Sequence, residues 1–369
     1  MLKRIKQAVT FLQYSGHLSL PVLLLMSSFL QAMEFASPAN GAKVSLLFPD
    51  WQRQIIKRSH RAVKALDKVN MDDRLDLPEK IVFAIKNGSL TSDSVLEISL
   101  DPKFVKIAQT LSFANNKHLQ VTNLEVNRTY YWRLRSGRKV LLKQHFFTLP
   151  NTPRFIAVPG GKPGNVRDLG GKKTLDGNMT VQGKIYRGTE MHNHFAITSE
   201  GKSFMLDFLK IRSDLDFRYP HEIAKYSQSP LGPQVKWITI PINAYKSFTP
   251  QQNDLFRDAI KFFANPAHYP IYMHCSGGVD RTGEIAYLLN MILNVDEETA
   301  LLDYEASSLS FFPRKRSIPY FEQWRKTIAN MSPPGTSSQQ QVVNYLKKIG
   351  VTEQDIKSIR KIMIERLSI

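Results

Sequence analysis

Residues 274–283, His-Cys-Ser-Gly-Gly-Val-Asp-Arg-Thr-Gly, contain the only cysteine in the 369 residues of the chain. The preceding segment, 270–274, is an apolar run typical of a buried strand, and residues 283–293 have the composition of a helix. The loop between them is therefore expected to join a strand end to a helix start, where backbone N–H groups converge and the helix dipole is positive. Such a place attracts an anion, and it favours the thiolate form of Cys275 over the thiol.

The other residues of this loop suit phosphate chemistry. Gly277 and Gly278 permit the backbone to curl closely round an oxyanion. Arg281 can direct two donors onto phosphate oxygens, and Thr282 places a hydroxyl group near the sulfur. These residue types in this order predict that Cys275 is a nucleophile toward a bound phosphoryl group.

The motif resembles the phosphate-binding loop of the cysteine-dependent tyrosine phosphatases, in which His-Cys is followed after five residues by Arg, then Ser or Thr, then Gly. The stretches GNVRDLGG (164–171) and IYRGTEM (185–191) extend the resemblance to the bacterial protein tyrosine/serine phosphatases. It covers residues 155–369. It implies a phosphatase domain that works through a cysteinyl-phosphate, with no metal and no cofactor.

The resemblance also implies roles for single residues. Cys275 would be the nucleophile, Arg281 would bind the phosphate oxygens, and Thr282 would assist the departure of the sulfur. His274 would support the loop. The backbone N–H groups expected to bind phosphate, together with Arg281, belong to Ser276, Gly277, Gly278 and Val279.

The leaving oxygen of a phosphate ester needs a proton, which a carboxylic acid usually supplies. Most relatives carry this Asp on a separate loop before the cysteine, but the corresponding stretch here, PINAYKSF (241–248), has no carboxylate. Asp280, inside the loop, is the nearest alternative. It could be the general acid, or it could fix the loop geometry by accepting backbone hydrogen bonds; both roles stay open.

Several other residues of the motifs have structural interpretations. Arg167 and Asp168 suit turn formation and buried ion pairing, and Asp216 with Arg218 is expected to form an ion pair at a strand end. Val279 stands where the bacterial relatives usually have Lys, a residue that adds charge for multiply phosphorylated ligands. Its absence weakens an assignment as a phosphoinositide or inositol-phosphate phosphatase, which is the enzymatic alternative.

A non-enzymatic alternative is a phosphate-binding interaction module with a vestigial catalytic site. The intact pair of Cys275 and Arg281 argues against it. The expected partners are a phosphorylated protein or a small phosphate monoester. Nucleic acid is not expected, because the basic stretch 53–69 lacks interleaved aromatic residues or glycines. The oligomeric state has no signature in the sequence.

Alternating strands and helices must position the loop, which predicts an α/β domain with a central sheet flanked by helices. The predicted strands include 184–188, 213–218, 235–242 and 270–274, and the predicted helices include 200–210, 250–265, 283–293 and 352–367. A Pro- and Gly-rich stretch at 149–165 marks the boundary with a different, N-terminal domain.

Residues 35–150 read mostly as strands with alternating apolar and polar side chains, interrupted by a helical insertion at 53–69. The segment resembles a fibronectin type III module, an immunoglobulin-like β-sandwich, and Leu124 with Tyr130 resembles its tyrosine corner. The predicted strands are 43–48, 80–85, 95–100, 118–124, 129–135 and 139–149.

Residues 1–32 have the pattern of a signal peptide. A basic start with Lys3, Arg4 and Lys6 precedes the apolar run LSLPVLLLMSSFL (18–30), and Ala32 offers a small residue for cleavage. We therefore expect an exported protein, periplasmic or extracellular, without stable membrane insertion after cleavage. The formal net charge of +18 favours anionic partners.

Overall fold

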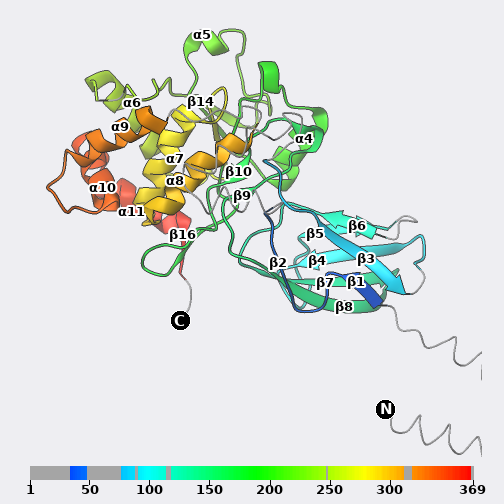
Figure 1. Cartoon of the computed structure of the whole chain (residues 1–369). Helices are drawn as coiled ribbons and strands as arrows, with labels where there is room; N and C mark the ends of the chain where they lie inside the picture. The colour runs from blue at the N-terminus through cyan, green and yellow to red at the C-terminus, as the bar shows by residue number, and fades with distance from the viewer. Residues whose placement is uncertain are drawn as a thin grey trace, which may run out of the picture. The chain divides into compact units, whose positions relative to one another are not determined.

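The computed structural model describes residues 34–47, 76–87, 90–113, 118–246, 248–310 and 318–366. The predicted signal peptide and the predicted helical insertion at 53–69 lie outside these residues. The chain forms two compact units (Figure 1). Of the described residues, the first unit contains those within 34–42, 82–120 and 129–146, and the second contains 43–47, 76–81, 121–128 and those within 147–366. Three stretches that precede residue 150, namely 43–47, 76–81 and 121–128, thus belong to the unit that carries Cys275.

The N-terminal strands form two sheets, in which β1 pairs antiparallel with β3, and β4 pairs antiparallel with β5 and β7. One sheet has the order β1-β3-β6 and the other has the order β2-β8-β7-β4-β5. The strands are β1 (Glu34–Ser37), β2 (Ala42–Val44), β3 (Ile81–Asn87), β4 (Ser94–Ser99), β5 (Gln109–Ser112), β6 (His118–Val121), β7 (Thr129–Ser136) and β8 (Lys139–Thr148). Strand β5, whose QTLS sequence is short and polar, is an addition to the predicted set.

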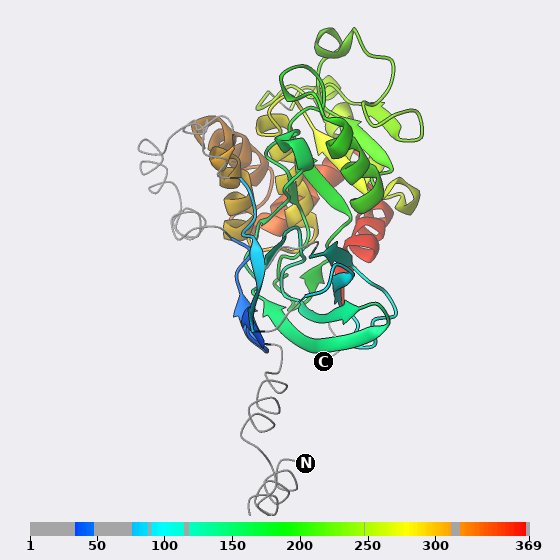
Figure 2. The ribbon, with the colours of Figure 1, turned by 90° about the vertical axis from the view of Figure 1, so that its right-hand side faces the viewer.

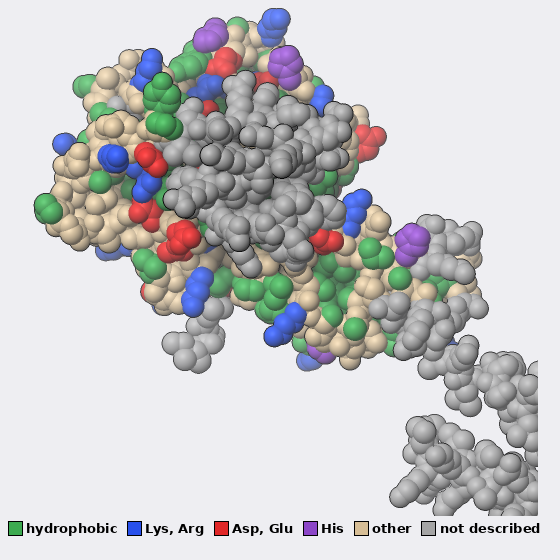
Figure 3. Space-filling view, viewed as in Figure 1, with side chains coloured by type: hydrophobic (Ala, Val, Ile, Leu, Met, Phe, Trp, Pro, Cys, Tyr) green, Lys and Arg blue, Asp and Glu red, His purple; other side chains and the backbone are tan. Residues whose placement is uncertain are grey.

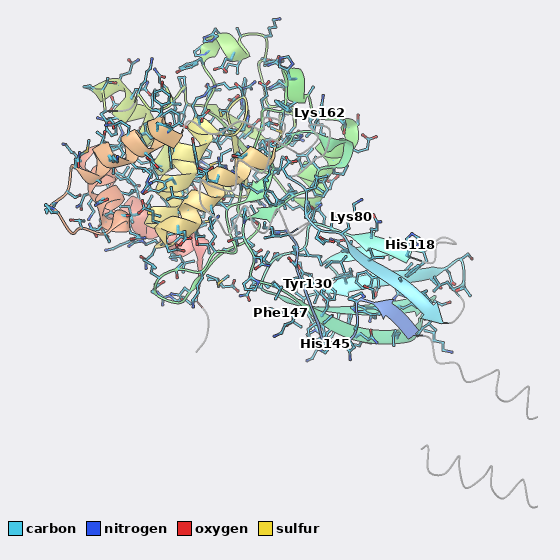
Figure 4. The ribbon with its side chains drawn as sticks, in the orientation of Figure 1. Lys80, His118, Tyr130, His145, Phe147 and Lys162 are labelled. Carbon is cyan, nitrogen blue, oxygen red and sulfur yellow. The ribbon has the colours of Figure 1, made fainter. Side chains whose placement is uncertain are left out.

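The core of the first unit follows from the alternation along β7. Tyr130, Trp132 and Leu134 are buried, while their neighbours along the strand are partly exposed. The Trp132 ring meets Phe83 edge-on, with centroids 5.3 Å apart. Figure 4 labels Tyr130 on β7 and His145 on the neighbouring strand β8. The fibronectin type III-like assignment of this segment stays a prediction.

The second unit contains a mixed sheet with the order β14-β13-β15-β12-β10-β9. The four strands β14, β13, β15 and β12 run parallel, so their carboxyl ends meet at one edge, where Asp216, His274 and Gly188 lie in register. That edge is where open α/β sheets bind ligands. The bounds are β9 (Arg154–Phe155), β10 (Arg167–Asp168), β12 (Ile185–Gly188), β13 (Ser213–Asp216), β14 (Lys236–Thr239) and β15 (Ile271–His274).

Helices surround this sheet, and α7 (Asp280–Ile292) lies in their middle, with α6, α8, α10 and α11 packed against it (Figures 1 and 2). Every residue of α7 from Thr282 to Ile292 is buried, because its sequence is apolar on almost all sides. The other helices are α4 (Ser199–Ser203) with the π-helical turn Phe204–Phe208, α5 (Pro220–Ile223), α6 (Pro250–Phe262), α8 (Glu297–Glu305), α9 (Ile318–Ala329), α10 (Ser338–Lys348) and α11 (Glu353–Met363).

Three predicted helix bounds differ from the structure by three or more residues, the first being the end of α6, which lies at Phe262 and not at residue 265. Helix α7 begins at Asp280, three residues before the predicted start, so Asp280 and Arg281 stand in its first turn. Helix α11 ends at Met363, and the chain continues as β16 (Ile364–Glu365), which pairs with β11 (Met179–Thr180). Sheet pairing therefore overrides the helical spacing of the last residues.

The described Lys and Arg side chains on the face shown in Figure 3 do not gather into one patch. On the face shown in Figure 3, the coloured Lys and Arg side chains are scattered among polar and apolar ones. Within the described part of the chain, no helix combines the length and the apolar character that a membrane crossing requires.

Candidate active site

The candidate site is the 275–281 loop, which leads from the last residue of β15 into the first turn of α7. Strand β15 is central in the parallel part of the sheet and buried at all four positions, so the place of the loop is fixed by the core. Cys275 is a free, buried cysteine, 4% exposed. The structure thus places the thiol at a strand end and a helix start, as the sequence predicts.

The backbone carbonyl groups of residues 275–279 in this loop all accept hydrogen bonds from the surrounding protein. In a trans peptide the N–H points in the opposite direction to the C=O. The N–H groups of residues 276–280 therefore point away from the donors that bind the carbonyl groups, toward the other face of the loop. The donors are His274 Nδ1 to Cys275 O (3.1 Å), Glu190 N to Ser276 O (3.0 Å), Asn165 Nδ2 to Gly277 O and Gly278 O (3.0 and 3.3 Å), and Arg187 Nη2 to Gly278 O and Val279 O (2.9 and 3.3 Å).

Gly278 is the position where the loop requires glycine. Its φ is +66°, and a Cβ atom there would lie 2.0 Å from the carbonyl oxygen of Gly188. A side chain would therefore push the loop off β12 and spoil the outward turn of its carbonyl groups. The two motifs IYRG and HCSGGVDRTG are in this way packed directly together.

The environment of Cys275 favours the thiolate. Burial works against the charged form, but the Arg281 guanidinium, the Thr282 hydroxyl and the Thr282 backbone N–H together lower the pKa of the thiol below its ordinary value. Thr282 is itself buried, so its hydroxyl group acts on the sulfur as a nearby dipole. A thiolate at this place is a nucleophile at neutral pH.

Arg281 is held by Glu222 from α5. Its Nη1 and Nη2 atoms donate to the two carboxylate oxygens of Glu222 at 2.7 and 3.1 Å, and Ser276 Oγ donates to Glu222 Oε1 at 2.7 Å. Although burial opposes it, the bonds from Arg281 and Ser276 lower the pKa of Glu222 to about 2. Glu222 therefore carries a negative charge beside the loop and fixes the direction of the Arg281 fork.

Asp280 receives hydrogen bonds from two phenols. Tyr245 Oη donates to Asp280 Oδ1 at 2.6 Å, and Tyr304 Oη lies 3.4 Å from the same oxygen. Tyr245 belongs to the stretch 241–248, in which the sequence has no carboxylate, and it reaches the loop with a φ of +59°. The stretch thus contributes a phenol that contacts Asp280.

Glu284, one helical turn after Asp280, was missed by the sequence analysis. It is fully buried, its Oε1 accepts a bond from Tyr245 N at 3.2 Å, and its Oε2 has no hydrogen-bond partner within the part of the chain that the structure describes. Burial above all, together with the charges of Asp280 and Cys275, raises its pKa well above the ordinary value. Glu284 is thus a buried carboxyl group behind the site that holds its proton more tightly than usual; its only signal in the sequence is a carboxylate within the apolar run 283–293.

The other carboxylates near the site are engaged elsewhere. Asp214 accepts a bond from His274 Nε2 at 2.9 Å, and Asp216 forms the ion pair with Arg218 that the sequence predicts, at 2.6 Å. All four side chains are buried. Asp214 and Asp216 therefore fix His274 and the strand ends, and neither side chain is free to serve a leaving group.

His274 joins this network to the loop. Although burial works against the charged form, Asp216 and Asp214 raise the pKa of His274 to about 9. The ring is therefore an imidazolium, with Nε2 on Asp214 and Nδ1 donating to the Cys275 carbonyl. This geometry fits the supporting role expected of His274.

The charge on His274 predicts a pH dependence of stability. Its folded pKa of about 9 lies above the ordinary 6.5, so its contribution is complete below pH 6.5 and is lost as the pH rises to about 9. We expect the wild type to lose on the order of 2–3 kcal/mol of unfolding free energy across this window. Urea titrations at the two pH values measure it, and His274→Gln should flatten the difference. An equal difference in the variant would contradict the assignment.

Arg167 and Asp168 lie behind the loop and have the structural roles expected of them. Asp168 pairs with Arg154 at 2.7 Å. Arg167 donates to the backbone and side-chain oxygens of Asn165 and to the Asp303 carbonyl. Within the described ranges, no group of three His, Cys, Asp or Glu side chains is arranged to hold a metal ion.

Comparisons with known proteins agree on this part of the chain. A family model described as the tyrosine phosphatase family matches residues 159–365, which include the whole 275–281 loop. A protein of Cupriavidus necator, provisionally named a tyrosine-protein phosphatase, is 27% identical over 208 residues, covering 48% of this chain and 73% of that protein.

Two solved structures are also similar. One is the core catalytic domain of the PP-IP phosphatase SIW14 from S. cerevisiae in complex with citrate, at 24% identity and a TM-score of 0.29, covering 40% of this chain and 86% of that chain. The other is a Siw14 catalytic core at 23% identity and a TM-score of 0.28, covering 41% of this chain and 89% of that chain.

Proposed function

The chain belongs to the tyrosine phosphatase family and is a phosphatase, and from this premise we propose that it hydrolyses phosphotyrosine in proteins through a cysteinyl-phosphate on Cys275. The observation that carries the proposal is the 275–281 loop, in which the carbonyl groups of residues 275–279 are bound by the surrounding protein, while a thiol of lowered pKa and a guanidinium stand at the two ends of the loop. Inward N–H groups and a cation are what three phosphoryl oxygens require.

The first chemical step follows from this arrangement. Cys275 Sγ attacks phosphorus as the bond from phosphorus to the ester oxygen breaks, while Arg281 and the N–H groups of the loop hold the three equatorial oxygens. Asp280 gives its proton to the departing oxygen, so the alcohol leaves neutral and the phosphoryl group stays on sulfur. Arg281 must turn partly from Glu222 to phosphate, and its short bonds to the carboxylate keep it close to that position.

The second step returns the enzyme to its starting state. Water attacks the phosphorus of the cysteinyl-phosphate, Asp280 takes a proton from the water, and the sulfur leaves as a thiolate. The dipole of Thr282 and the charge of Arg281, which lower the pKa of Cys275, make the thiolate a good leaving group. The products are inorganic phosphate and the regenerated site.

Two observations support phosphotyrosine as the substrate class. The partly buried Tyr219 ring lies next to Arg281, with the guanidinium carbon 5.2 Å from the ring centroid, and it stacks on His221 with centroids 5.5 Å apart. An aromatic group beside the phosphate site can pack against a phenyl ester. Val279 adds no charge for a ligand with several phosphates, which disfavours inositol phosphates.

Tyr219→Ala tests this assignment. The variant keeps the backbone bond from Tyr219 N to Glu222 and removes the ring, so kcat/KM for a phosphotyrosine peptide should fall about 3- to 10-fold. Hydrolysis of a small alkyl phosphate should be unchanged, and Tyr219→Phe should retain the wild-type preference. A parallel loss on both substrates would contradict a specificity role.

A substrate panel tests the proposal as a whole. It contains phosphotyrosine and phosphoserine peptides, phosphoinositides, inositol phosphates and an aryl phosphate that releases a coloured phenol. We expect the highest kcat/KM on the phosphotyrosine peptide. A higher kcat/KM on inositol phosphates would make these the substrate class instead of phosphotyrosine. No turnover of any substrate in the panel would favour a phosphate-binding module. Export and the fibronectin type III-like module belong to the proposal on the basis of the sequence alone.

A further inference from the structure

Asp76 lies next to the site although it belongs neither to the family match at 159–365 nor to the predicted catalytic domain. It stands in the described stretch 76–81, which is part of the second compact unit. Its side chain is 1% exposed, and its Oδ2 accepts a hydrogen bond from the backbone N–H of Asn165 at 2.6 Å. A buried carboxylate that binds a backbone N–H at this distance fixes that peptide firmly.

Asn165 is the residue through which this bond reaches the 275–281 loop. It is fully buried, with a positive φ of 55°, and each of its polar atoms has a partner. Its N–H goes to Asp76, its side-chain NH2 to Gly277 O and Gly278 O, and its two oxygens accept from Arg167 Nη1. A side chain whose polar atoms all have hydrogen-bond partners is held in one orientation, so the direction of its NH2 group is fixed.

The direction of this NH2 group determines how the peptides after Gly277 and Gly278 are oriented. The bonds to Gly277 O and Gly278 O hold two successive carbonyl groups outward, and the N–H groups of Gly278 and Val279 consequently face the anion. Without the bond to Asp76, the Asn165 backbone loses one of its fixed points, and Asn165 has an unsatisfied buried N–H. The loop peptides then lose part of their alignment.

We propose that Asp76 is a positioning residue for the phosphate site, acting through Asn165, so that the chain before the catalytic domain completes the active site. The inference rests on the proposed function of the 275–281 loop. It gives Asp76 a part in positioning the loop that no local motif indicates. It also predicts that the effects of substituting Asp76 and Asn165, which lie 89 positions apart in the sequence, do not add.

The test uses the full chain with Asp76→Ala, Asp76→Asn and Asn165→Ala. The first readout is inhibition by vanadate, a phosphate analogue. The second is the pH dependence of alkylation by iodoacetamide, which reports on Cys275 alone because the chain has one cysteine. Asp101→Ala is the control, because Asp101 also accepts backbone N–H bonds, from Lys103 and Val105, but is only partly buried and lies in the first unit.

We expect Asp76→Ala to weaken vanadate inhibition and to lower kcat/KM by about 10- to 100-fold. Its alkylation midpoint should move to higher pH, since the loop N–H groups stabilise the thiolate less well. Asp76→Asn, which keeps an acceptor oxygen, should retain most of the wild-type behaviour. The double variant with Asn165→Ala should lose no more than Asn165→Ala alone. Asp101→Ala should match the wild type in both readouts.

Unchanged vanadate inhibition and an unchanged alkylation profile in folded Asp76→Ala would overturn the proposal, as would additive losses in the double variant. If Asp76→Ala does not fold, Asp76→Leu, which keeps the volume but lacks the oxygen, takes its place under the same criteria. Failure of the proposed function would be distinguishable, because the wild type would then show neither turnover nor vanadate inhibition, while the alkylation profile would still compare the variants.

Discussion

Replacing Cys275 by serine is expected to lower kcat at least about 10⁴-fold on every substrate. The serine hydroxyl keeps its proton at neutral pH, and the charge of Arg281 that favours a thiolate cannot make an alkoxide of it. Because serine is close to cysteine in size, the buried position and the outward carbonyl groups should be retained. Steady-state turnover of the coloured aryl ester measures the effect.

The control for this variant is its fold. Thermal unfolding of Cys275→Ser should resemble that of the wild type, and the variant should still bind inorganic phosphate, because Arg281 and the loop N–H groups are intact. Residual activity above about a tenth of the wild-type rate would sink the nucleophile assignment, whatever the substrate.

Asp280→Asn is expected to separate substrates by their leaving groups. Esters of low-pKa phenols leave without a proton and should lose little, whereas tyrosyl and alkyl esters should lose about 10²–10⁴-fold in kcat. The two phenols on Asp280 Oδ1, from Tyr245 and Tyr304, hold the carboxyl group in one place, so its other oxygen is the one that can reach a leaving group. A series of aryl esters with graded pKa values measures the slope.

A structural Asp280 would give a different result. If the carboxyl group only fixes the loop, its loss should slow all esters alike and weaken phosphate binding, and the slope should match the wild type. Tyr245→Phe is the matched control, since it removes one donor to Asp280 and leaves the acid itself. If Asp280→Asn slows every ester in the series by the same factor, Asp280 is not the general acid. Glu284, whose pKa is raised and whose Oε2 has no partner among the described residues, would then be the next residue to test.

The site could be predicted from sequence where its residues are local. The strand, the glycine-rich loop and the helix of residues 270–293 are contiguous, so residue types and spacing suffice to place Cys275 and Arg281 together. The buried pairing of Asp216 with Arg218 is likewise short-range, two residues apart on one strand end.

Long-range partners could not be predicted in this way. Glu222 meets Arg281 across 59 residues, Tyr245 meets Asp280 across 35, and Asp76 meets Asn165 across 89. Each contact depends on how strands and loops assemble, which no periodicity encodes. The end of α11 at Met363 has the same origin, because β16 is chosen by its pairing with β11.

The central claim is that Cys275 carries the phosphoryl group during turnover. Rapid acid quenching of the wild type with an aryl phosphate, followed by digestion and mass spectrometry, tests it directly. The peptide that contains Cys275 should gain about 80 Da, the mass of one phosphoryl group, and the gain should vanish in Cys275→Ser. Turnover with no added mass on that peptide at any quench time, or the same mass on another residue, would contradict the account.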